Sequence, residues 1–509
     1  MSIKKEVFIK IKKQKVIIIG AGTAGITIAK NLQIFFDVLL IEKSKYKKYP
    51  ILYKIPLLIG LIFRDDKTKY LSKRDISLSD GRNIPFFESN LLGGASVING
   101  CVHMVGSKAR WEKILSKFEM TYSDLIDSNK KLYSTNKKNS GNKINLTSAP
   151  QNLIDSIFIK SLGLRNIEVG DMNFSDKVSC GPILNTVKNY FRTSVLSIIN
   201  QNKLNISQGE MVERILYDEG GKVNGVKTNL RSINSDFVIL SGGVIGTCSF
   251  LLKNQNDLFS SKMSNQNLRP PNFKIKDHAN LRINVITKRN FGSLNEVSNS
   301  FYKKFLLISK HFFGRSSLMQ GTGATSAVHL DLDNDGQVDT RIQIVQFTET
   351  GRHGSDGKHF TDKSGFSLSI NPISPISEGE ISLDGSDCIV NPKYLTSKQD
   401  LKLLMSALKF CLSILRSEPF NEHISEIMNE KDIEENPEKY IFDNIFSGHH
   451  LIGGASDIVN KDFECKSVKG LYVCDASIFS EYAASNIHSS VVLISDLFSQ
   501  KFIKKNLTI

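Results

Sequence analysis

The chain has 509 residues, of which 40% are hydrophobic and 23% are charged. This balance is typical of a folded globular protein and excludes wholesale disorder, and at ~150 residues per domain the length predicts two or three domains. No apolar run reaches the ~18 residues that a transmembrane helix needs. The longest such run, residues 51–63, contains Lys54, and we interpret it as a buried segment.

Lysine and arginine (66) outnumber aspartate and glutamate (51), which gives a formal net charge of +15. A charge of this size can mark a partner such as nucleic acid or an anionic membrane. The lysines are spread along the whole chain, however, and no basic motif interleaved with aromatic residues occurs. We therefore interpret the charge as a solvated, lysine-rich surface and expect no nucleic-acid partner.

The seven cysteines are odd in number and include no C-x-x-C pair. This pattern favours a reducing compartment over a disulfide-stapled secreted protein. The basic start of the chain and the apolar residues 16–19 resemble a signal peptide, but Gly20-Ala21-Gly22, which follows, is better explained as part of the mature fold. We expect a cytoplasmic protein without a transmembrane segment.

The first predicted element is a buried strand, residues 15–19, followed by a G-x-G-x-x-G motif and a helical pattern. In such a motif Gly20 makes the tight turn, Gly22 lets the backbone approach a pyrophosphate, and Gly25 allows the helix to pack closely on the strand. The amino end of the helix then faces the phosphates. Glu42 ends the next strand, where a carboxylate accepts hydrogen bonds from ribose hydroxyls. The pattern predicts a dinucleotide site and leaves FAD and NAD both open.

The later elements are predicted in coarser form. Residues 108–190 are polar and helix-like, and residues 206–238 read as short strands with Gly220-Gly221 at a hairpin turn. Residues 280–383 alternate apolar and polar positions, which predicts an antiparallel sheet. Helical periodicity predicts a helix over residues 398–415.

Four segments resemble motifs of the glucose-methanol-choline (GMC) oxidoreductases. Residues 92–100, LGGASVING, are similar to the family's flavin-contact segment, and Asp277-His278 resembles its DH pair at a domain crossover. Residues 365–395 are similar to substrate-domain strands that end in the family's DPxYL element, here NPKYL. The closing segment carries HLIGG at 450–454, GLYVCDAS at 470–477 and then Asn486, which resemble three family elements in the same order.

The resemblance implies an α/β fold: a Rossmann-like FAD-binding domain with an interleaved α+β substrate domain built on an antiparallel sheet. It divides the chain into FAD-binding segments at 1–107, 191–280 and 441–509, a cap of helices at 108–190, and a substrate-binding segment at 281–440.

It further implies non-covalently bound FAD, because Ile98 stands where family members with covalently linked flavin have histidine. The implied cofactor-binding residues are Gly20, Gly22, Gly25, Glu42, Gly93, Gly94, Ser96, Asn99, Val212, Asp475 and Ala476. Asp475 has an alternative role as the cap of the helix that follows it. A basic residue that the family has before the LGG element is replaced by Glu88-Ser89-Asn90, and the family's second signature is degraded around residues 241–254.

The same resemblance implies that His450 is the base that takes the hydroxyl proton, a role that suits an imidazole because its pKa lies near neutral pH. Its neighbour His449 is the rival, and if His450 faces the flavin then His449 points elsewhere. Asn486 is the implied second polar residue, with His488 as the alternative and helix capping as the structural explanation for an asparagine there.

The function that follows is an FAD-dependent oxidoreductase that takes a hydride from the CH–OH group of an alcohol, sugar or polyol. A small-molecule hydroxyl compound is the expected substrate, and the electron acceptor stays open. Two alternatives remain: a flavin-binding protein of the same fold without turnover, and an NAD-dependent dehydrogenase.

An acidic loop at residues 331–336, DLDNDG, resembles the start of a calcium loop. A complete EF-hand loop ends with a bidentate glutamate at position twelve, where this chain has Ile342. Asn334-Asp335-Gly336 is also a strong hairpin-turn signal. We therefore predict a turn and no metal site.

Overall fold

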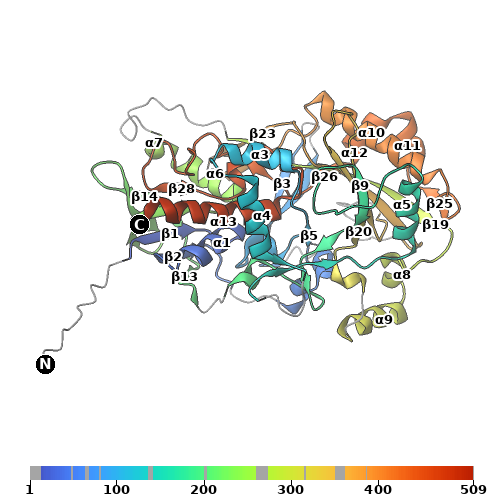
Figure 1. Ribbon diagram of the computed structural model, residues 1–509, viewed down its shortest axis with the longest axis horizontal. Helices are drawn as coiled ribbons and strands as arrows, with labels where there is room; N and C mark the ends of the chain where they lie inside the picture. Colours follow the sequence, from blue (N-terminus) through green and yellow to red (C-terminus); the bar gives the residue numbers. More distant parts are fainter. Residues whose placement is uncertain are drawn as a thin grey trace.

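The computed structural model describes residues 13–46, 50–63, 68–78, 82–135, 141–199, 203–259, 273–313, 317–349, 361–385 and 387–507. Its two halves lie side by side, one built on a parallel sheet and the other on an antiparallel sheet (Figure 1).

A five-stranded parallel sheet, in the order β13-β2-β1-β17-β28, forms the first half. Apart from the edge strand β13, its strands are short and mostly apolar, because both faces of the sheet are covered. They are β1 (Lys15–Ile19), β2 (Asp37–Glu42), β13 (Ile206–Gln208), β17 (Phe237–Leu240) and β28 (Leu471–Val473). Since parallel strands end at the same edge, the turns that follow β1, β2, β17 and β28 meet there.

Two helices far apart in the sequence pack against each other beside this sheet. They are α1 (Thr23–Leu32) and α13 (Ile487–Asn506), and the latter runs lengthwise along this half of the molecule (Figure 1). The Asn31 Nδ2 donates a hydrogen bond of 2.8 Å to Asp496, and the rings of Phe36 and Phe502 lie 5.3 Å apart. A small antiparallel sheet, β14 (Val212–Tyr217), β15 (Val223–Thr228) and β16 (Ser232–Asn234), contacts β17, and its first hairpin turns at the predicted Gly220-Gly221.

A seven-stranded sheet forms the second half, with every pair antiparallel. In order its strands are β25 (Ile424–Ile427), β19 (Ala279–Thr287), β22 (Gly365–Pro372), β21 (Thr340–Val345), β20 (Ala324–Leu330) and β9 (Ser179–Pro182), and β26 (Phe446–Ser447) also pairs with β19.

The two faces of this sheet differ in polarity. One face carries rows of apolar residues such as Ile283, Leu368 and Ile344, which pair across three strands and are buried in the core. The helices α5 (Leu153–Gly163) and α10 (Lys398–Leu415) pack on the sheet, and α10 coincides with the predicted helix. The residues between these rows are mostly polar, and side chains such as Asn284, Ser367 and Gln343 form a second face.

A four-stranded antiparallel sheet, β24-β23-β18-β27, joins the halves. Its strands are β24 (Asp387–Asn391), β23 (Gly379–Asp384), β18 (Lys274–Lys276) and β27 (Ile452–Gly453). The chain passes from β18 directly into β19 of the large sheet, and from β26 of the large sheet directly into β27. These two crossings run side by side, because Lys276 pairs with Ile452 and Ala279 with Ser447.

Shorter elements cover the remaining surface. The helices are α2 (Ile59–Ile62), α3 (Lys108–Ser116), α4 (Tyr122–Leu132), α6 (Gly243–Lys253), α7 (Gln255–Leu258), α8 (Leu294–Ser298), α9 (Phe301–Phe312), α11 (Glu430–Glu435) and α12 (Pro437–Asn444). The strands are β3 (Leu71–Ser77), β4 (Asn83–Ser89), β5 (Val102–His103), β6 (Tyr133–Ser134), β7 (Ile144–Asn145), β8 (Thr147–Ser148), β10 (Leu184–Asn185), β11 (Val187–Lys188) and β12 (Phe191–Arg192). The 3₁₀ turns are η1 (Ile51–Lys54), η2 (Pro56–Leu58), η3 (Gly94–Val97), η4 (Val195–Ile198), η6 (Leu318–Gln320) and η7 (Ala476–Ile478).

The predicted α/β fold class, with its interleaved antiparallel substrate domain, is confirmed. The prediction that residues 51–63 form a buried segment is wrong at its start: the Ile51 side chain is 60% exposed and Leu52 is exposed beside it. Pro56 and the 3₁₀ turns around it break the segment, so that only part of it reaches the interior. Within the described ranges, none of the helices combines the length and the apolarity that a bilayer crossing requires.

Candidate active site

Two glycine-rich loops face each other at the carboxyl edge of the parallel sheet. Gly20 has a φ of +101°, and a Cβ on Gly25 would lie 1.9 Å from the Gly20 carbonyl oxygen, so both positions require glycine. Gly93, whose N–H donates to the Ala21 carbonyl, belongs to the second loop. In the same loop, a Cβ on Gly94 would lie 2.8 Å from the Gly22 Cα.

Glu42 lies at the same edge and holds the first glycine loop. Its carboxylate accepts hydrogen bonds of 2.8 Å from the Ala21 N–H and the Ser44 N–H. The segment that leads into Val212 crosses beside it, because the Glu210 N–H donates to the Glu42 carbonyl at 3.1 Å. The Val212 side chain is buried in the small antiparallel sheet, so only its backbone is suited to a ligand contact.

Ser96 and Asn99 stabilise the second glycine loop from within. The Ser96 hydroxyl donates to the Gly93 carbonyl at 2.7 Å. Asn99 is held by Arg192, whose Nη1 donates to the Asn99 Oδ1 and to its backbone carbonyl, both at 2.6 Å. The Arg192 Nη2 is buried and has no partner among the described residues. Sequence reasoning missed Arg192, because it lies in a short strand with no motif around it.

Asp475 follows β28, and its carboxylate binds the chain itself. It accepts hydrogen bonds from the Ser477 N–H at 2.8 Å, the Gly243 N–H at 2.9 Å and the Thr247 hydroxyl at 2.5 Å. It therefore caps η7 and ties it to the start of α6, which is the capping alternative that the sequence left open. Burial raises the pKa of this carboxyl group. The backbone of Ala476, rather than the Asp475 side chain, remains for contacts with a ligand.

The geometry of this edge fits a dinucleotide. The amino end of α1 has no side-chain cap and no acidic residue in its first turn, so its N–H groups and dipole are available to an anion. A Cβ on Gly22 would meet only the Gly94 Cα, at 4.0 Å, so the two glycines leave an open cradle in front of that helix end. A pyrophosphate fits there, with a ribose next to Glu42.

His450 lies where the chain crosses between the two large sheets, and hydrogen bonds hold its backbone N–H and its carbonyl group. Its N–H donates to the Asp277 carboxylate at 2.8 Å, and its carbonyl accepts from the Tyr482 hydroxyl at 2.9 Å. The Asp277 carboxylate also accepts from the hydroxyl groups of Tyr394 and Ser447, each at 2.5 Å. One buried carboxylate thus orients three segments around His450.

The His450 ring lies against His278. Their Nδ1 atoms are 2.9 Å apart, so one ring donates a proton and the other accepts it. Burial, and secondarily the Arg341 cation, lower the pKa of His450 to about 4. Burial, followed by His450, lowers the pKa of His278 well below its usual value. Both rings are therefore neutral near pH 7, and with Nδ1 engaged the Nε2 of His450 is the nitrogen left for substrate.

His449 points away from this pair. Its ring packs between the rings of Phe86 and Phe87 from β4, with centroids 5.0 and 6.1 Å away, and its φ is +57°. The side chains of two consecutive residues thus diverge, as expected if His450 is the functional one.

Asn486 and His488 lie at the amino end of α13. Asn486 occupies the N-cap position, but its side chain makes no capping hydrogen bond. Burial, and secondarily the Arg192 cation, lower the pKa of His488 to about 4. The His488 Nε2 is buried and has no partner among the described residues. Both side chains are therefore available to a ligand at this helix end.

The polar face of the seven-stranded sheet borders the same region. A Cβ on Gly448 would lie 3.0 Å from the His450 Nδ1 and 3.2 Å from the Asn280 Nδ2, so Asn280 of β19 lies close to His450. Two strands along, Arg341 of β21 is 1% exposed. In a strand of alternating apolar and polar residues, a single arginine is expected to face solvent, so the sequence did not indicate that Arg341 belongs to the site.

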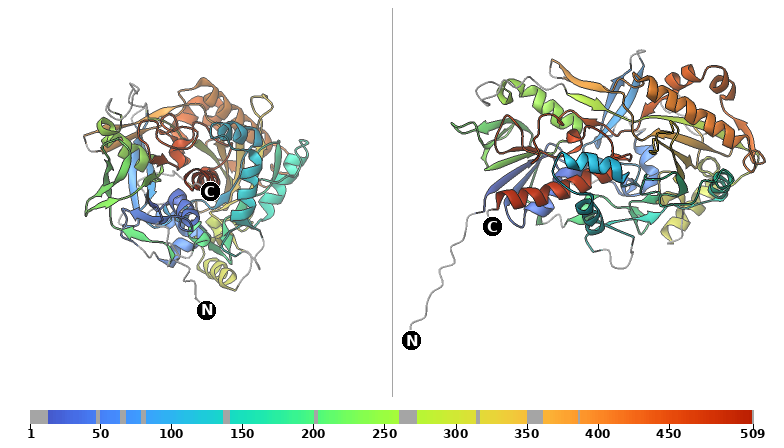
Figure 2. Two further views of the ribbon diagram at one scale, coloured as in Figure 1. Left: turned by 60° about the vertical axis from the view of Figure 1, so that its left-hand side comes forward. Right: turned by 45° about the horizontal axis from the view of Figure 1, so that its top comes forward.

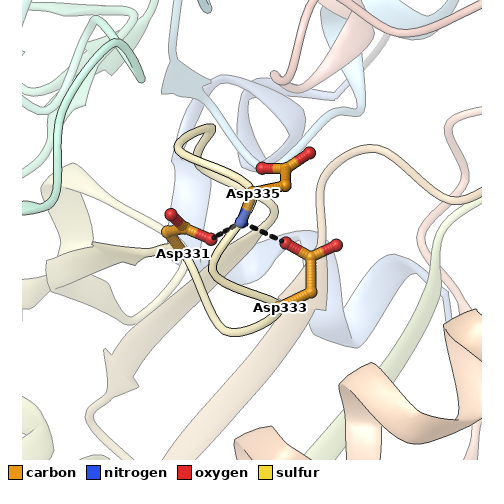
Figure 3. A group of neighbouring side chains, drawn as sticks. All are labelled: Asp331, Asp333 and Asp335. Carbon is orange, nitrogen blue, oxygen red and sulfur yellow. Dashed lines mark hydrogen bonds between the residues drawn. The ribbon is translucent and has the colours of Figure 1, made fainter.

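The acidic loop lies in the hairpin between β20 and β21 (Figure 3). Asp331, Asp333 and Asp335 bring one carboxylate oxygen each within 4.8 Å of the others. Asp331 and Asp333 accept hydrogen bonds from the Asp335 N–H, both at 3.2 Å, which is ordinary turn geometry. Ile342, the residue at position twelve, is buried in β21.

Comparisons with known proteins agree with this geometry. Residues 375–495 match the family model of the GMC oxidoreductases. The chain is 23% identical to a glucose dehydrogenase [FAD, quinone] of Drosophila pseudoobscura pseudoobscura, over 94% of this chain and 85% of that protein. It is also 23% identical to an oxygen-dependent choline dehydrogenase of Staphylococcus saprophyticus, over 94% and 93%.

Solved structures of similar fold include formate oxidase of Aspergillus oryzae RIB40, with a TM-score of 0.82 and 17% identity over 97% of this chain and 99% of that one. Pyridoxine 4-oxidase from Mesorbium loti has a TM-score of 0.78 and 16% identity over 96% and 99%. At these identities the likeness concerns the fold.

Proposed function

We propose, from the match to the GMC oxidoreductase family model and from the curated relatives, that this chain is an FAD-dependent oxidoreductase of that family, acting on the CH–OH group of an alcohol, sugar or polyol. The relatives named above are a glucose dehydrogenase and a choline dehydrogenase, and the substrates in their names are both small hydroxyl compounds. The observation that carries the proposal is the position of His450, a half-buried neutral imidazole held by Asp277 and His278.

The described residues that would hold FAD are those at the carboxyl edge of the parallel sheet. The cradle between Gly22 and Gly94 suits the pyrophosphate, Glu42 the ribose, and the backbones of Val212 and Ala476 the adenine and ribityl parts. Ile98 offers no nucleophile for a covalent bond, which supports non-covalent attachment. When bound, the flavin supplies the hydride acceptor of the reaction.

His450 takes the hydroxyl proton of the substrate on its Nε2. A base must be unprotonated to act, and a pKa of about 4 keeps the ring neutral at physiological pH. Its Nδ1 partner, His278, fixes the orientation of the ring and the nitrogen that carries the proton.

A second polar side chain from the amino end of α13 would hold the substrate oxygen as negative charge develops on it. Asn486 is the residue that the family resemblance indicates. The unpartnered Nε2 of His488 favours His488 for the same role. Fixed donors in a water-poor pocket contribute several kcal/mol to such stabilisation.

Two organisational proposals accompany this function. The FAD-binding part is assembled from residues 1–107, 191–280 and 441–509, and the substrate part from 108–190 and 281–440. A reducing, cytoplasmic location is supported by the seven cysteines, all of which are unpaired and buried.

The purified protein should be yellow, with flavin absorption bands that bleach under anaerobic conditions when a suitable alcohol is added. Bound flavin that a broad alcohol panel fails to reduce would favour a flavin-binding protein without turnover. Absence of flavin together with reduction of added NAD would favour the pyridine-nucleotide dehydrogenase instead.

A further inference from the structure

Arg341 is a buried cation without a counter-ion. The only hydrogen bond of its side chain among the described residues runs from Nη1 to the Met104 sulfur at 3.3 Å, whereas its Nε and Nη2 are buried without partners. Burial alone lowers its pKa to about 10, so it stays charged at neutral pH, and no carboxylate contributes to that value. An unpaired buried charge is strongly destabilising, which argues for a ligand that completes it.

The guanidinium group lies on the active-site side of the seven-stranded sheet. Arg341 pairs with His329 on one neighbouring strand and with Asn371 on the other. Because Leu281 pairs with Ile370, the preceding residue, Asn280, lies opposite Asn371, in the same row across the sheet as Arg341. Asn280 is the residue that borders His450. Two strand spacings, about 10 Å, therefore separate the backbone at Arg341 from the backbone beside the base.

Met104, which the guanidinium contacts, connects it to the other wall of the site. It packs in one apolar cluster with Ala484, two residues before Asn486, and with Ile373. Its carbonyl accepts a hydrogen bond from Ser489, in the first turn of α13. Arg341 also lies close enough to His450 for its cation to lower the pKa of that ring.

The two free donors have the geometry of a carboxylate site. Nε and Nη2 lie on the same edge of a guanidinium group, so one carboxylate can accept from both. The chain uses the same edge elsewhere, where Arg231 donates from Nε and Nη2 to the two oxygens of Glu210, both at 3.0 Å. Neutral alcohols offer no charge to balance Arg341. Neutral His329 beside it supplies none either, since burial and then the Arg341 cation lower the pKa of His329 to about 3.

We propose that Arg341 binds a carboxylate group of the substrate through Nε and Nη2, so that the alcohol oxidised at His450 is a hydroxy acid. This inference rests on the function proposed above and narrows its substrate class. The carboxylate neutralises the buried cation, and its distance from the hydroxyl carbon is set by the interval between Arg341 and His450.

The test uses the flavin-loaded enzyme and matched pairs of alcohols: glucuronate with glucose, glycolate with ethylene glycol, and lactate with 1,2-propanediol. The measured quantity is the rate constant of anaerobic flavin reduction divided by the dissociation constant of the alcohol. For at least one pair, this ratio should be about 100-fold or more higher for the acid than for its neutral partner. Arg341→Met should abolish that preference, and Arg341→Lys should restore part of it. Arg289→Met, at an exposed arginine, is the control and should leave the preference unchanged.

Binding without turnover gives a second readout. Malonate, which has no hydroxyl group, should raise the melting temperature of the wild type and not that of Arg341→Met. The unliganded Arg341→Met protein should melt at or above the wild-type temperature, because the substitution removes an unpaired buried charge. A purely structural arginine would give a large decrease instead, and that result would overturn the proposal.

The outcomes separate this proposal from the proposed function. Equal reduction by neutral alcohols and acids refutes the carboxylate site and leaves the oxidoreductase intact. Malonate stabilisation that depends on Arg341, in a protein whose flavin no alcohol reduces, supports the site and refutes the function. Malonate stabilisation of Arg341→Met equal to that of the wild type refutes the site.

The helix α9 has an apolar side that faces solvent, and this feature is independent of Arg341. Phe301, Phe305, Ile308 and Phe312 follow the spacing i, i+4, i+7, i+11 and form one stripe. The three phenylalanines are 87%, 60% and 62% exposed. The helix is attached through a side next to the stripe, where His311 is buried against Phe191 and Tyr190. Figures 1 and 2 show α9 at the edge of the molecule.

The charges around the stripe indicate what covers it. Lys304 and Lys310 are exposed on α9, which contains no acidic residue, and the chain has a net charge of +15. Exposed aromatic residues flanked by lysines are typical of helices that lie in the interface of an anionic bilayer. A second copy of the chain would bring the same lysines together in a symmetric contact, which disfavours self-association.

We propose that α9 docks on the surface of a membrane containing anionic lipids, with its phenylalanine stripe inserted and its lysines at the headgroups. The holoenzyme should sediment with vesicles of phosphatidylcholine and phosphatidylglycerol. It should do so much less with phosphatidylcholine alone, and the bound fraction should fall as salt rises.

Paired variants test the two parts of this surface. Phe301→Ser with Phe305→Ser, and separately Lys304→Glu with Lys310→Glu, should each reduce vesicle binding at least tenfold. The matched controls are Leu164→Ser with Leu230→Ser, at exposed leucines, and Lys402→Glu with Lys409→Glu, at exposed lysines of α10. Controls that lose as much binding, or a wild-type dimer that the phenylalanine variant converts to a monomer, would overturn the proposal.

Discussion

The Nδ1 atom of His278 lies 2.9 Å from the Nδ1 atom of His450. The two residues are far apart in the sequence, and they meet because the β18–β19 and β26–β27 crossings run side by side. One ring must donate and the other accept, so the proton state of His278 decides which nitrogen of His450 holds a lone pair. His278 is therefore a positioning residue for the proposed base.

Replacing His278 by leucine should slow flavin reduction by roughly fivefold, the equivalent of one lost neutral hydrogen bond of about 1 kcal/mol. Because His450 would lose the partner that fixes its ring, the acid limb of the pH–rate profile should also move. His278→Gln, which keeps a polar group, should recover part of the rate. An unchanged pH profile in the leucine variant would contradict the positioning role.

Replacing His450 by alanine should lower the rate of flavin reduction by about 10² to 10⁴-fold, the usual contribution of a general base. Bound flavin and its spectrum should persist. His449→Ala is the matched comparison, and it should affect thermal stability more than rate, because His449 packs on Phe86 and Phe87. A larger loss of rate in His449→Ala than in His450→Ala would refute the assignment.

Alanine substitutions at Asn486 and His488 should separate the two candidates at the amino end of α13. Substitution of the residue that holds the developing oxygen charge should lower the rate at saturating substrate by roughly 10² to 10³-fold. The other should change binding or stability alone. Because the His488 Nε2 is buried without a partner, we expect the larger loss at His488; equal small losses at both positions would exclude this helix end from the chemistry.

Gly22→Ala should reduce FAD content without unfolding the protein. The new Cβ would meet only the Gly94 Cα, at 4.0 Å, and would fill the cradle proposed for the pyrophosphate. The flavin-to-protein absorbance ratio and the melting temperature of the flavin-free protein are the two readouts. Gly246→Ala, in α6 with nothing within 4 Å of its Cβ, is the control and should keep its flavin.

His103 should make the stability of the protein depend on pH. Burial, and secondarily His488, lower its pKa to about 3 in the folded state, against about 6.5 in the unfolded chain. Below pH 6.5 the unfolded state therefore binds a proton that the folded state does not, so stability falls as pH falls. From pH 6.5 to pH 5 this amounts to about 2 kcal/mol.

In His103→Phe, the loss of unfolding free energy between pH 7 and pH 5 should be smaller than in the wild type by that amount. Urea denaturation at the two pH values measures it. Identical losses in the two proteins would show that His103 is not held neutral.

The loops at the carboxyl edge of the parallel sheet could be predicted from the sequence because their signals are local. The G-x-G-x-x-G turn, its flanking strand and helix, and Glu42 all lie within residues 15–42. The closing elements around His450 were recognised as a resemblance, and the α/β fold class that the resemblance implied is confirmed.

What the sequence could not give depends on contacts between distant segments. The approach of His278 to His450 requires the pairing of two crossings, and the burial of Arg341 requires knowing which face of β21 is covered. The prediction that residues 51–63 are buried was wrong at its start for a related reason. Apolar composition alone does not say which side of a 3₁₀ turn faces the interior, and Ile51 and Leu52 face outward.

The carboxylate of Asp277 carries a last implication, for how the enzyme matures. It receives hydrogen bonds from Tyr394, Ser447 and His450, so the imidazole reaches its working orientation only after three remote stretches of polypeptide have docked. Residues 441–509 supply β26, β27 and β28 together with the proposed proton acceptor, so removing them would take away part of the parallel sheet and the proposed base at once. The proposed oxidation therefore depends on the docking of all three segments as well as on the glycine loops that lie near the start of the chain.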